Sequence, residues 1–246
     1  MPYGTKSLAT VERYGIENAK FLEAHGIKLL VVACNTASAL ALPAIRNAVS
    51  VPVIGVIEPG ARAATAVAGG KTIGVIATEA TIQSGAYAGA IAGIDPATKV
   101  IERSCPLFVP LAEEGWADTD VARAVAEEYL SDFKKLDIGA LVLGCTHYPI
   151  LQDLIAEVVG VEVVLIDSGE AAAHEVKALL KTTNTGGLFA PPTAAGAHRQ
   201  LCDDLDHFYV TDAAERFAKV AERFLGMSPS VLEAVEVWGH DELRTY

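Results

Sequence analysis

The chain has 246 residues, about half of them apolar (51%), and a formal net charge of −12. This length and composition indicate a globular protein with a sizeable core rather than a disordered chain. The 31 acidic against 19 basic residues disfavour nucleic acid and anionic membranes as main partners, and no apolar run is long enough for a membrane helix.

Short β-rich runs alternate with helical stretches, which favours an α/β fold. The β-rich runs are nearly continuously apolar, as is typical of a parallel sheet covered on both faces. Turn residues between 181 and 192 predict a loop that connects lobes, and the tail after Gly226 is expected to be peripheral. The pattern predicts strands at 28–33, 52–57, 72–77, 99–103, 139–143, 161–166 and 207–211, and helices at 7–24, 37–48, 61–68, 80–92, 119–135, 150–158, 170–181 and 213–225.

The four cysteines, Cys34, Cys105, Cys145 and Cys202, lie far apart and form no CxxC motif. This spacing disfavours a zinc site or a thioredoxin-like motif. The first six residues carry no apolar signal region, so we expect a cytoplasmic protein whose cysteines are free thiols. Neither clustered metal ligands nor a GxGxxG phosphate loop occurs, and we expect neither a metal nor an organic cofactor.

Two segments look like copies of one functional element. Each is an apolar run that ends in a cysteine, Cys34 or Cys145, and continues with small polar residues. Each is followed by another apolar run that ends in an acidic residue, Glu58 or Asp167. A duplicated strand–cysteine–helix–strand unit predicts two thiols placed symmetrically about one pocket. Two thiols on opposite faces of one substrate carbon suit the transfer of a proton from one face to the other.

Both cysteines are predicted at the carboxyl end of a strand, where parallel α/β sheets bind their ligands. A helix is predicted to follow each cysteine, and its N-terminus should lower the pKa of the thiol and hold a substrate carboxylate. The alternative is that Cys34 and Cys145 are small buried core residues. Their paired placement in a repeated unit favours a functional site.

Polar side chains follow both cysteines: Asn35 and Thr36 after the first, Thr146 and His147 after the second. With backbone N–H groups, they can bind a carboxylate and an ammonium group. His147 is also a candidate for proton transfer beside Cys145. Helix capping is the structural alternative for the Asn and Thr residues, and it is compatible with substrate binding.

Several other stretches have a structural interpretation that competes with a role in a site. Residues 3–5 favour a turn, and residues 78–81 either hold an anion or cap a helix through Thr78 or Thr81. Residues 113–116 are interpreted as an acidic, solvated loop. Capping by Asp167 or Ser168 explains the start of the helix at 170, and Cys105 and Cys202 are expected to be structural.

Four stretches of the chain resemble the signature motifs of glutamate racemases. The likeness covers nearly all of residues 2–225. The two cysteine motifs alone fit the wider aspartate/glutamate racemase superfamily, whereas Pro-Tyr-Gly-Thr-Lys-Ser points to the glutamate enzyme. The four stretches are Pro2–Ser7, Val32–Ser38, Val56–Ala61 and Gly144–Pro149.

The resemblance implies two pseudo-symmetric α/β lobes with mostly parallel sheets and an active site between them. Residues 1–60 with 171–228 would form the first lobe, 61–170 the second, and 229–246 a peripheral tail. The activity implied is a cofactor-independent, two-base interconversion of L- and D-glutamate that supplies D-glutamate for peptidoglycan. A homodimer is a further expectation, because the family often dimerises.

In the mechanism that the resemblance implies, Cys34 takes the α-proton from D-glutamate and Cys145 takes it from L-glutamate. The opposite thiol returns a proton to the other face, so one cysteine is thiolate while the other is thiol. Glu113 matches an assisting carboxylate. The residues expected to bind substrate are Tyr3, Gly4, Asn35, Thr36, Thr81, Thr146 and His147.

The family also carries an N-terminal strand that ends in Asp-Ser-Gly, upstream of Pro-Tyr-Gly. This chain begins at Pro-Tyr-Gly, and its Asp-Ser-Gly at 167–169 belongs to the second repeat. We therefore expect the genomic DNA to continue in frame upstream of Met1 and to encode Asp-Ser-Gly about 30 to 40 residues earlier. The chain as written is expected to be impaired in activity, stability or both. An in-frame stop just before Met1, together with full racemase activity, would contradict this expectation.

Three alternatives stay open at this point. One is an aspartate racemase or another amino-acid racemase of the superfamily. A second is acyl transfer by a cysteine nucleophile with His147, which needs only one essential cysteine. A third is a non-catalytic binding protein on the same fold, which predicts ligand binding without exchange of solvent deuterium at Cα.

Overall fold

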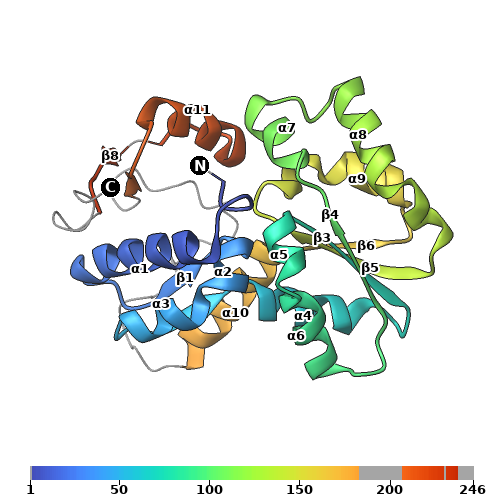
Figure 1. Ribbon diagram of the computed structural model, residues 1–246, viewed down its shortest axis with the longest axis horizontal. Helices are drawn as coiled ribbons and strands as arrows, with labels where there is room; N and C mark the ends of the chain where they lie inside the picture. Colours follow the sequence, from blue (N-terminus) through green and yellow to red (C-terminus); the bar gives the residue numbers. More distant parts are fainter. Residues whose placement is uncertain (1, 183–206, 230, 238–246) are drawn as a thin grey trace. The chain divides into compact units, whose positions relative to one another are not determined.

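The computed structural model describes residues 2–182, 207–229 and 231–237 (Figure 1). Contacts group the chain into two compact units, Met1–Leu179 and Leu180–Tyr246. Each strand pair in the described residues is parallel, as the apolar runs predict. Of the loop predicted at 181–192, Lys181 and Thr182 are helical and the rest lies outside the described residues, as does Cys202. The lobe boundaries at 60/61 and 170/171 stay a prediction.

A four-stranded parallel sheet with the order β4-β3-β5-β6 forms the core of the first unit. All seven residues of β5 are buried, so the sheet has no solvent-facing side at its centre. The register pairs Ala77 with Gly144 and Leu143 with Asp167, so that β3, β5 and β6 end at the same edge. The strands are β3 (Thr72–Ala77), β4 (Val100–Ser104), β5 (Ile138–Gly144) and β6 (Val164–Asp167).

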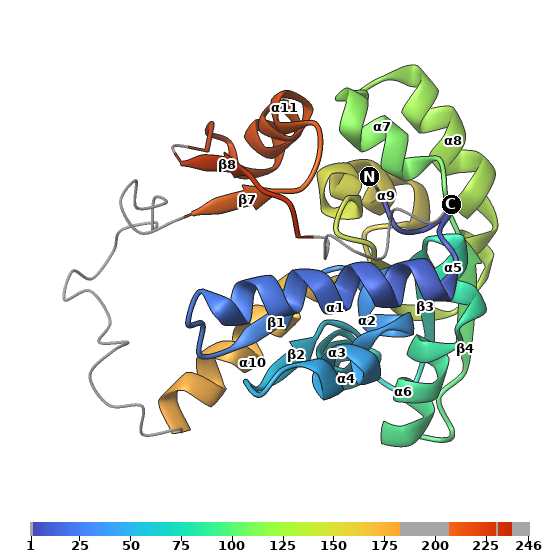
Figure 2. The same ribbon diagram turned by 60° about the vertical axis from the view of Figure 1, so that its left-hand side comes forward.

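Helices cover both faces of this sheet (Figures 1 and 2). Because side chains alternate along a strand, Leu141 and Leu143 of β5 join one core with α7, α8 and α9. Ala140 and Val142 face the other way and join a second core with α4 and α6. The helices are α4 (Ile57–Val67), α5 (Glu79–Gln83), α6 (Ala86–Ile94), α7 (Phe108–Glu114), α8 (Asp120–Leu130) and α9 (Gln152–Val159), with 3₁₀ turns at Ser131–Lys135 and Tyr148–Leu151.

A separate two-stranded parallel sheet, β1 with β2, lies in the same unit. Val11, Leu30 and Ile45 belong to a third core, which joins this sheet to its helices. The first unit thus has two parallel sheets, each with one of the repeated cysteines after a strand, as the two-lobed α/β arrangement requires. The remaining elements are α1 (Leu8–Ala24), β1 (Leu30–Val32), α2 (Asn35–Leu40), α3 (Leu42–Ala48), β2 (Val53–Gly55) and α10 (Ser168–Thr182).

The second unit contains β7 (Phe208–Val210), α11 (Ala214–Leu225) and β8 (Leu232–Ala234), and the two strands pair in parallel. β8 was not predicted, because the tail after Gly226 shows little hydrophobic periodicity. Within the described ranges, no helix is both long and apolar enough to cross a membrane.

The predicted helices differ from the structure where glycine or proline interrupts them. The helix expected at 37–48 is two helices that meet at Ala41, with Pro43 in the first turn of the second. The helix expected at 80–92 breaks at Gly85, whose φ of 64° is left-handed. The interpretation of 113–116 as a loop is wrong at its start, because Glu113 belongs to α7, which ends at the left-handed Gly115.

Candidate active site

Cys34 is the N-cap residue of α2, directly beyond β1. Its Sγ accepts a hydrogen bond from the backbone N–H of Ala37 at 3.5 Å. Ser38 ties this turn to the strands, since its Oγ donates to the carbonyl of Val32 (2.8 Å) and accepts from the N–H of Val56 (3.2 Å). The apolar strand followed by small polar residues therefore places the thiol at a helix N-terminus, as predicted.

Cys145 directly follows β5 and is only 7% exposed. Its Sγ lies 3.7 Å from Nδ1 of His147, and Nε2 of His147 lies 3.2 Å from Oε1 of Glu113. Because a carboxylate only accepts, the proton of the neutral ring belongs on Nε2, and Nδ1 is then the acceptor for the thiol S–H. A 3₁₀ turn that begins at Tyr148 lies between Cys145 and α9. Contrary to the prediction, this thiol therefore does not cap an α-helix.

Glu113 was interpreted as part of a solvated loop, and this is wrong. Its side chain is 16% exposed and faces His147. The cause is α7, which the sequence did not reveal: Pro110 stands in its first turn, where a missing N–H costs no helical hydrogen bond. The structure therefore brings together three of the predicted catalytic residues, Cys145, His147 and Glu113.

The N–H groups at the start of α2 lower the pKa of Cys34, as predicted, but the net shift is upward at both thiols. Burial raises the pKa of Cys34, although hydrogen bonds from Ala37 and Thr36 oppose the rise. Burial raises the pKa of Cys145 to about 12, with the backbone N–H of His147 opposing it and the negative charges of Cys34 and Glu113 adding to it. Loss of solvation outweighs the N–H groups both at the buried Cys145 and at the partly buried Cys34. The repulsion between the two thiolates favours a state with one thiolate and one thiol.

His147 is neutral near pH 7, because burial lowers its pKa despite the opposing effect of Glu113. The imidazole is thus a proton acceptor beside the Cys145 thiol. This arrangement supports the predicted role of His147 in proton transfer.

The two repeated elements meet directly. The hydroxyl of Thr146, which follows Cys145, donates to the carbonyl of Ala33, which precedes Cys34, at 3.1 Å. The structure therefore brings the two predicted cysteines into one site.

Asn35 is buried in a polar network that joins the two sheets. Its Nδ2 donates to Oγ of Ser168 at 3.0 Å, and its Oδ1 accepts from the hydroxyl of Tyr87 at 2.6 Å. Ser168 in turn donates to the carbonyl of Leu143 at 3.3 Å. Tyr87 was not predicted, and Ser168 was interpreted only as a helix cap. The capping is performed by Asp167, whose Oδ1 accepts from the first N–H groups of α10 (2.7 and 3.3 Å).

Three threonine hydroxyls form a closed triangle beside α2. Thr36 lies 3.0 Å from Thr78 and 3.1 Å from Thr81, and Thr78 lies 3.0 Å from Thr81. Gly4 packs against this triangle, since a Cβ on Gly4 would lie 2.6 Å from Cβ of Thr78. The predicted residues Thr36, Thr81 and Gly4 thus belong to one cluster.

Tyr3 stands in the predicted turn, which is closed by a hydrogen bond from the N–H of Lys6 to its carbonyl at 2.9 Å. Its hydroxyl accepts from Nδ2 of Asn18 at 3.5 Å. Tyr3 and Cys34 both pack against the third core, and burial, with the charge of Cys34, raises the pKa of Tyr3.

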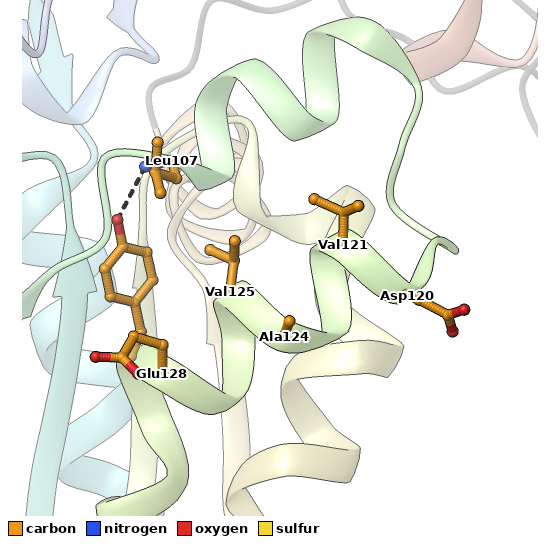
Figure 3. Close-up of a pocket in the computed structure, with 7 residues that line it drawn as sticks. Leu107, Asp120, Val121, Ala124, Val125 and Glu128 are labelled. Carbon is orange, nitrogen blue, oxygen red and sulfur yellow. Dashed lines mark hydrogen bonds between the residues drawn. The ribbon is translucent and has the colours of Figure 1, made fainter.

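Other features of the described residues lie apart from this site. Cys105 is fully buried with a raised pKa of about 12, as a structural cysteine should be. A groove of about 450 Å³ runs along α8, where Leu107, Val121 and Val125 line it (Figure 3). No predicted site residue lines this groove. The described part of the chain also holds no group of three or more His, Cys, Asp or Glu side chains placed to bind a metal ion.

Comparison with known proteins agrees with this geometry. The family model described as Asp/Glu/Hydantoin racemase matches residues 3–176. A glutamate racemase of Geobacter metallireducens is 51% identical over 226 residues, which are 92% of this chain and 80% of that protein. The chain belongs to the glutamate racemase family.

Solved glutamate racemases share the fold of this family member. A glutamate racemase isoform of Bacillus anthracis superposes with a TM-score of 0.83 at 37% identity, covering 96% of this chain and 84% of the other. The glutamate racemase of Francisella tularensis, solved in complex with D-glutamate, gives a TM-score of 0.81 at 38% identity and the same coverage. Each match covers 96% of this chain, so it includes both of the sheets that are followed by a cysteine of the site.

Proposed function

We propose that this chain is a cofactor-independent racemase that interconverts L-glutamate and D-glutamate. The observation that carries the proposal is the pair of thiols, one after a strand of each sheet, brought into one site by the contact between Thr146 and Ala33. Membership of the glutamate racemase family supports the choice of substrate. The product D-glutamate is a building block of peptidoglycan, so the reaction serves cell wall biogenesis. Action in the cytoplasm and assembly as a homodimer belong to the same proposal.

The chemistry requires two bases because the two enantiomers carry the α-proton on opposite faces. From L-glutamate, the Cys145 thiolate takes the α-proton and the electron pair stays on Cα. The Cys34 thiol then gives its proton to the opposite face, which leaves D-glutamate and a Cys34 thiolate. From D-glutamate the same steps run in reverse. A single base tends to return the proton to the face from which it came.

Cys145 forms its thiolate by passing a proton to Nδ1 of His147. The imidazolium that results lies between the thiolate and the carboxylate of Glu113, 3.2 Å from Nε2, and is stabilised by both charges. The raised thiol pKa values make both thiolates strong bases, which suits the removal of a very weakly acidic proton.

The substrate is held by the polar groups that surround the thiols. Asn35 and Thr36, with the N–H groups at the start of α2, offer donors for the carboxylates and stabilise the carbanion-like state. Thr146 donates its hydroxyl proton to Ala33, so its oxygen is left to accept from the substrate ammonium group. Removal of the α-proton builds up negative charge on the α-carboxylate. Hydrogen-bond donors that point at this carboxylate therefore stabilise the transition state more than the bound substrate. Tyr3 and Gly4 complete the site, and Thr81 orients the hydroxyl of Thr36.

The proposal is tested by following the circular-dichroism signal of each glutamate enantiomer with purified protein. We expect the signal to decay to zero from either enantiomer. Faster decay with aspartate would favour the aspartate racemase alternative. Saturable glutamate binding with no decay, and with no deuterium uptake at Cα in D2O, would favour a non-catalytic binding protein.

The pH dependence of the reaction follows from the protonation state of His147. His147 can receive the Cys145 proton only while its ring is neutral, and burial lowers its pKa, so kcat/KM should rise with pH below about pH 6.5 and then change little up to about pH 8, because proton transfer within the site leaves the number of bound protons unchanged. The rise should be the same from L- and D-glutamate, because enantiomers have equal free energies and their kcat/KM values must match. Initial rates at several pH values test this, and a fall in kcat/KM over that range would contradict the assignment.

A further inference from the structure

We propose that Tyr87 is a positioning residue that sets the geometry of both thiol-bearing segments and the orientation of the Asn35 amide. This inference rests on the proposed function. Tyr87 belongs to α6, is fully buried, and touches residues that are direct neighbours of Cys34 and Cys145.

The ring of Tyr87 lies between two glycines. A Cβ on Gly144 would lie 3.1 Å from Cε2 of the ring, and a Cβ on Gly60 would lie 3.3 Å from Cε1 and 3.2 Å from the hydroxyl. Both contacts are closer than ordinary side-chain packing, so the absence of a side chain at each glycine makes room for the ring. Gly144 ends β5 and directly precedes Cys145.

The hydroxyl of Tyr87 reaches the other thiol-bearing segment. It donates to Oδ1 of Asn35 at 2.6 Å, and Asn35 directly follows Cys34. A tyrosine side chain has few rotatable bonds and keeps a fixed length. The buried ring therefore links the backbone beside one thiol to the side chain beside the other.

The direction of the hydrogen bonds shows which atom of the Asn35 amide faces Tyr87. The carbonyl of Leu143 can only accept, so Ser168 donates to it and accepts from Nδ2 of Asn35. Oδ1 then faces Tyr87 and accepts the phenol proton. Nδ2 carries a second N–H, which this orientation leaves to donate to a substrate carboxylate.

The network is closed off from water, because Tyr87 is 0%, Asn35 2% and Ser168 2% exposed. Water therefore cannot replace a lost partner easily. Burial raises the pKa of Tyr87, so the phenol stays a proton donor throughout the working pH range. Without the hydroxyl, Oδ1 of Asn35 has no donor in this direction, and the amide can rotate.

The test is Tyr87→Phe, which keeps the ring and removes only the hydroxyl. The matched control is Tyr148→Phe, another fully buried tyrosine whose hydroxyl donates to the carbonyl of Cys105 at 2.9 Å. We expect Tyr87→Phe to raise KM for both enantiomers about three- to tenfold, the effect of one hydrogen bond, while kcat changes less than about twofold. The control should lose similar thermal stability and keep its KM.

A double-mutant cycle with Asn35→Ala separates positioning from general damage. If Tyr87 acts through Asn35, Tyr87→Phe should change KM less than about twofold in the Asn35→Ala background. An unchanged KM in Tyr87→Phe alone, or an effect of the same size in both backgrounds, would overturn the proposal.

Calorimetric titration with glutamate keeps this test independent of turnover. Tyr87→Phe should weaken glutamate binding by the same three- to tenfold, about the effect of one hydrogen bond. A parent chain that binds glutamate without racemising it would refute the proposed function and leave this comparison intact. A parent chain that does not bind glutamate would overturn both.

Discussion

Removal of either active-site thiol is expected to abolish racemisation. Cys34→Ala and Cys145→Ala should each lower kcat/KM from both enantiomers by much more than tenfold, which corresponds to a loss well above about 1.4 kcal/mol of transition-state stabilisation. The reason is geometric: each thiol serves one face of Cα, and inversion needs a proton removed from one face and another delivered to the other. Circular-dichroism turnover from each enantiomer measures the effect.

The control for these variants is Cys105→Ala. Cys105 is fully buried, and its Sγ donates to the carbonyl of Arg103 at 3.9 Å, away from the residues of the site. This variant should racemise glutamate at the parent rate, whatever its effect on stability. The two-base assignment is wrong if Cys34→Ala or Cys145→Ala keeps more than about a tenth of the parent rate. A loss in only one of them would instead favour a single cysteine nucleophile.

Replacement of His147 by asparagine is expected to lower kcat about a hundredfold, the lower range for a lost general acid–base group. An asparagine oxygen can still accept a hydrogen bond from the Cys145 thiol, but it cannot take the proton. Cys145 then keeps its raised pKa of about 12 without a partner that receives its proton. Steady-state rates with both enantiomers measure the loss.

His174→Asn is the matched control, because His174 lies on the exposed surface of α10, near Glu170. It should leave kcat and KM at parent values. A His147→Asn variant with a kcat within about threefold of the parent would show that Cys145 does not need this proton acceptor.

The positions of the two thiols could be predicted from the sequence because the signal is local. A continuous apolar run fixes a buried strand, and the residue after a parallel strand lies at the edge where ligands bind. The same rule applied to the end of β6 would have pointed to Ser168, since Asp167 ends that strand as Gly144 ends β5.

Other parts of the site depend on contacts that the sequence does not show. The thiol pKa values rise because tertiary packing removes water from Cys34 and Cys145, and a motif carries no measure of that burial. Tyr87 stands in a helix of small apolar residues, where nothing marks its hydroxyl as a partner of Asn35. Glu113 was misread because α7 is short and contains a proline.

Exchange of solvent deuterium at Cα tests the two-base account most directly. Cys34→Ala and Cys145→Ala are each incubated with L- and with D-glutamate in D2O, and the Cα–H signal is followed by proton NMR. The account predicts that Cys34→Ala, with only Cys145, exchanges L-glutamate without inversion and leaves D-glutamate protonated, and that Cys145→Ala does the reverse. Exchange of both enantiomers by one variant, or of neither enantiomer by both variants while the parent racemises, would contradict it.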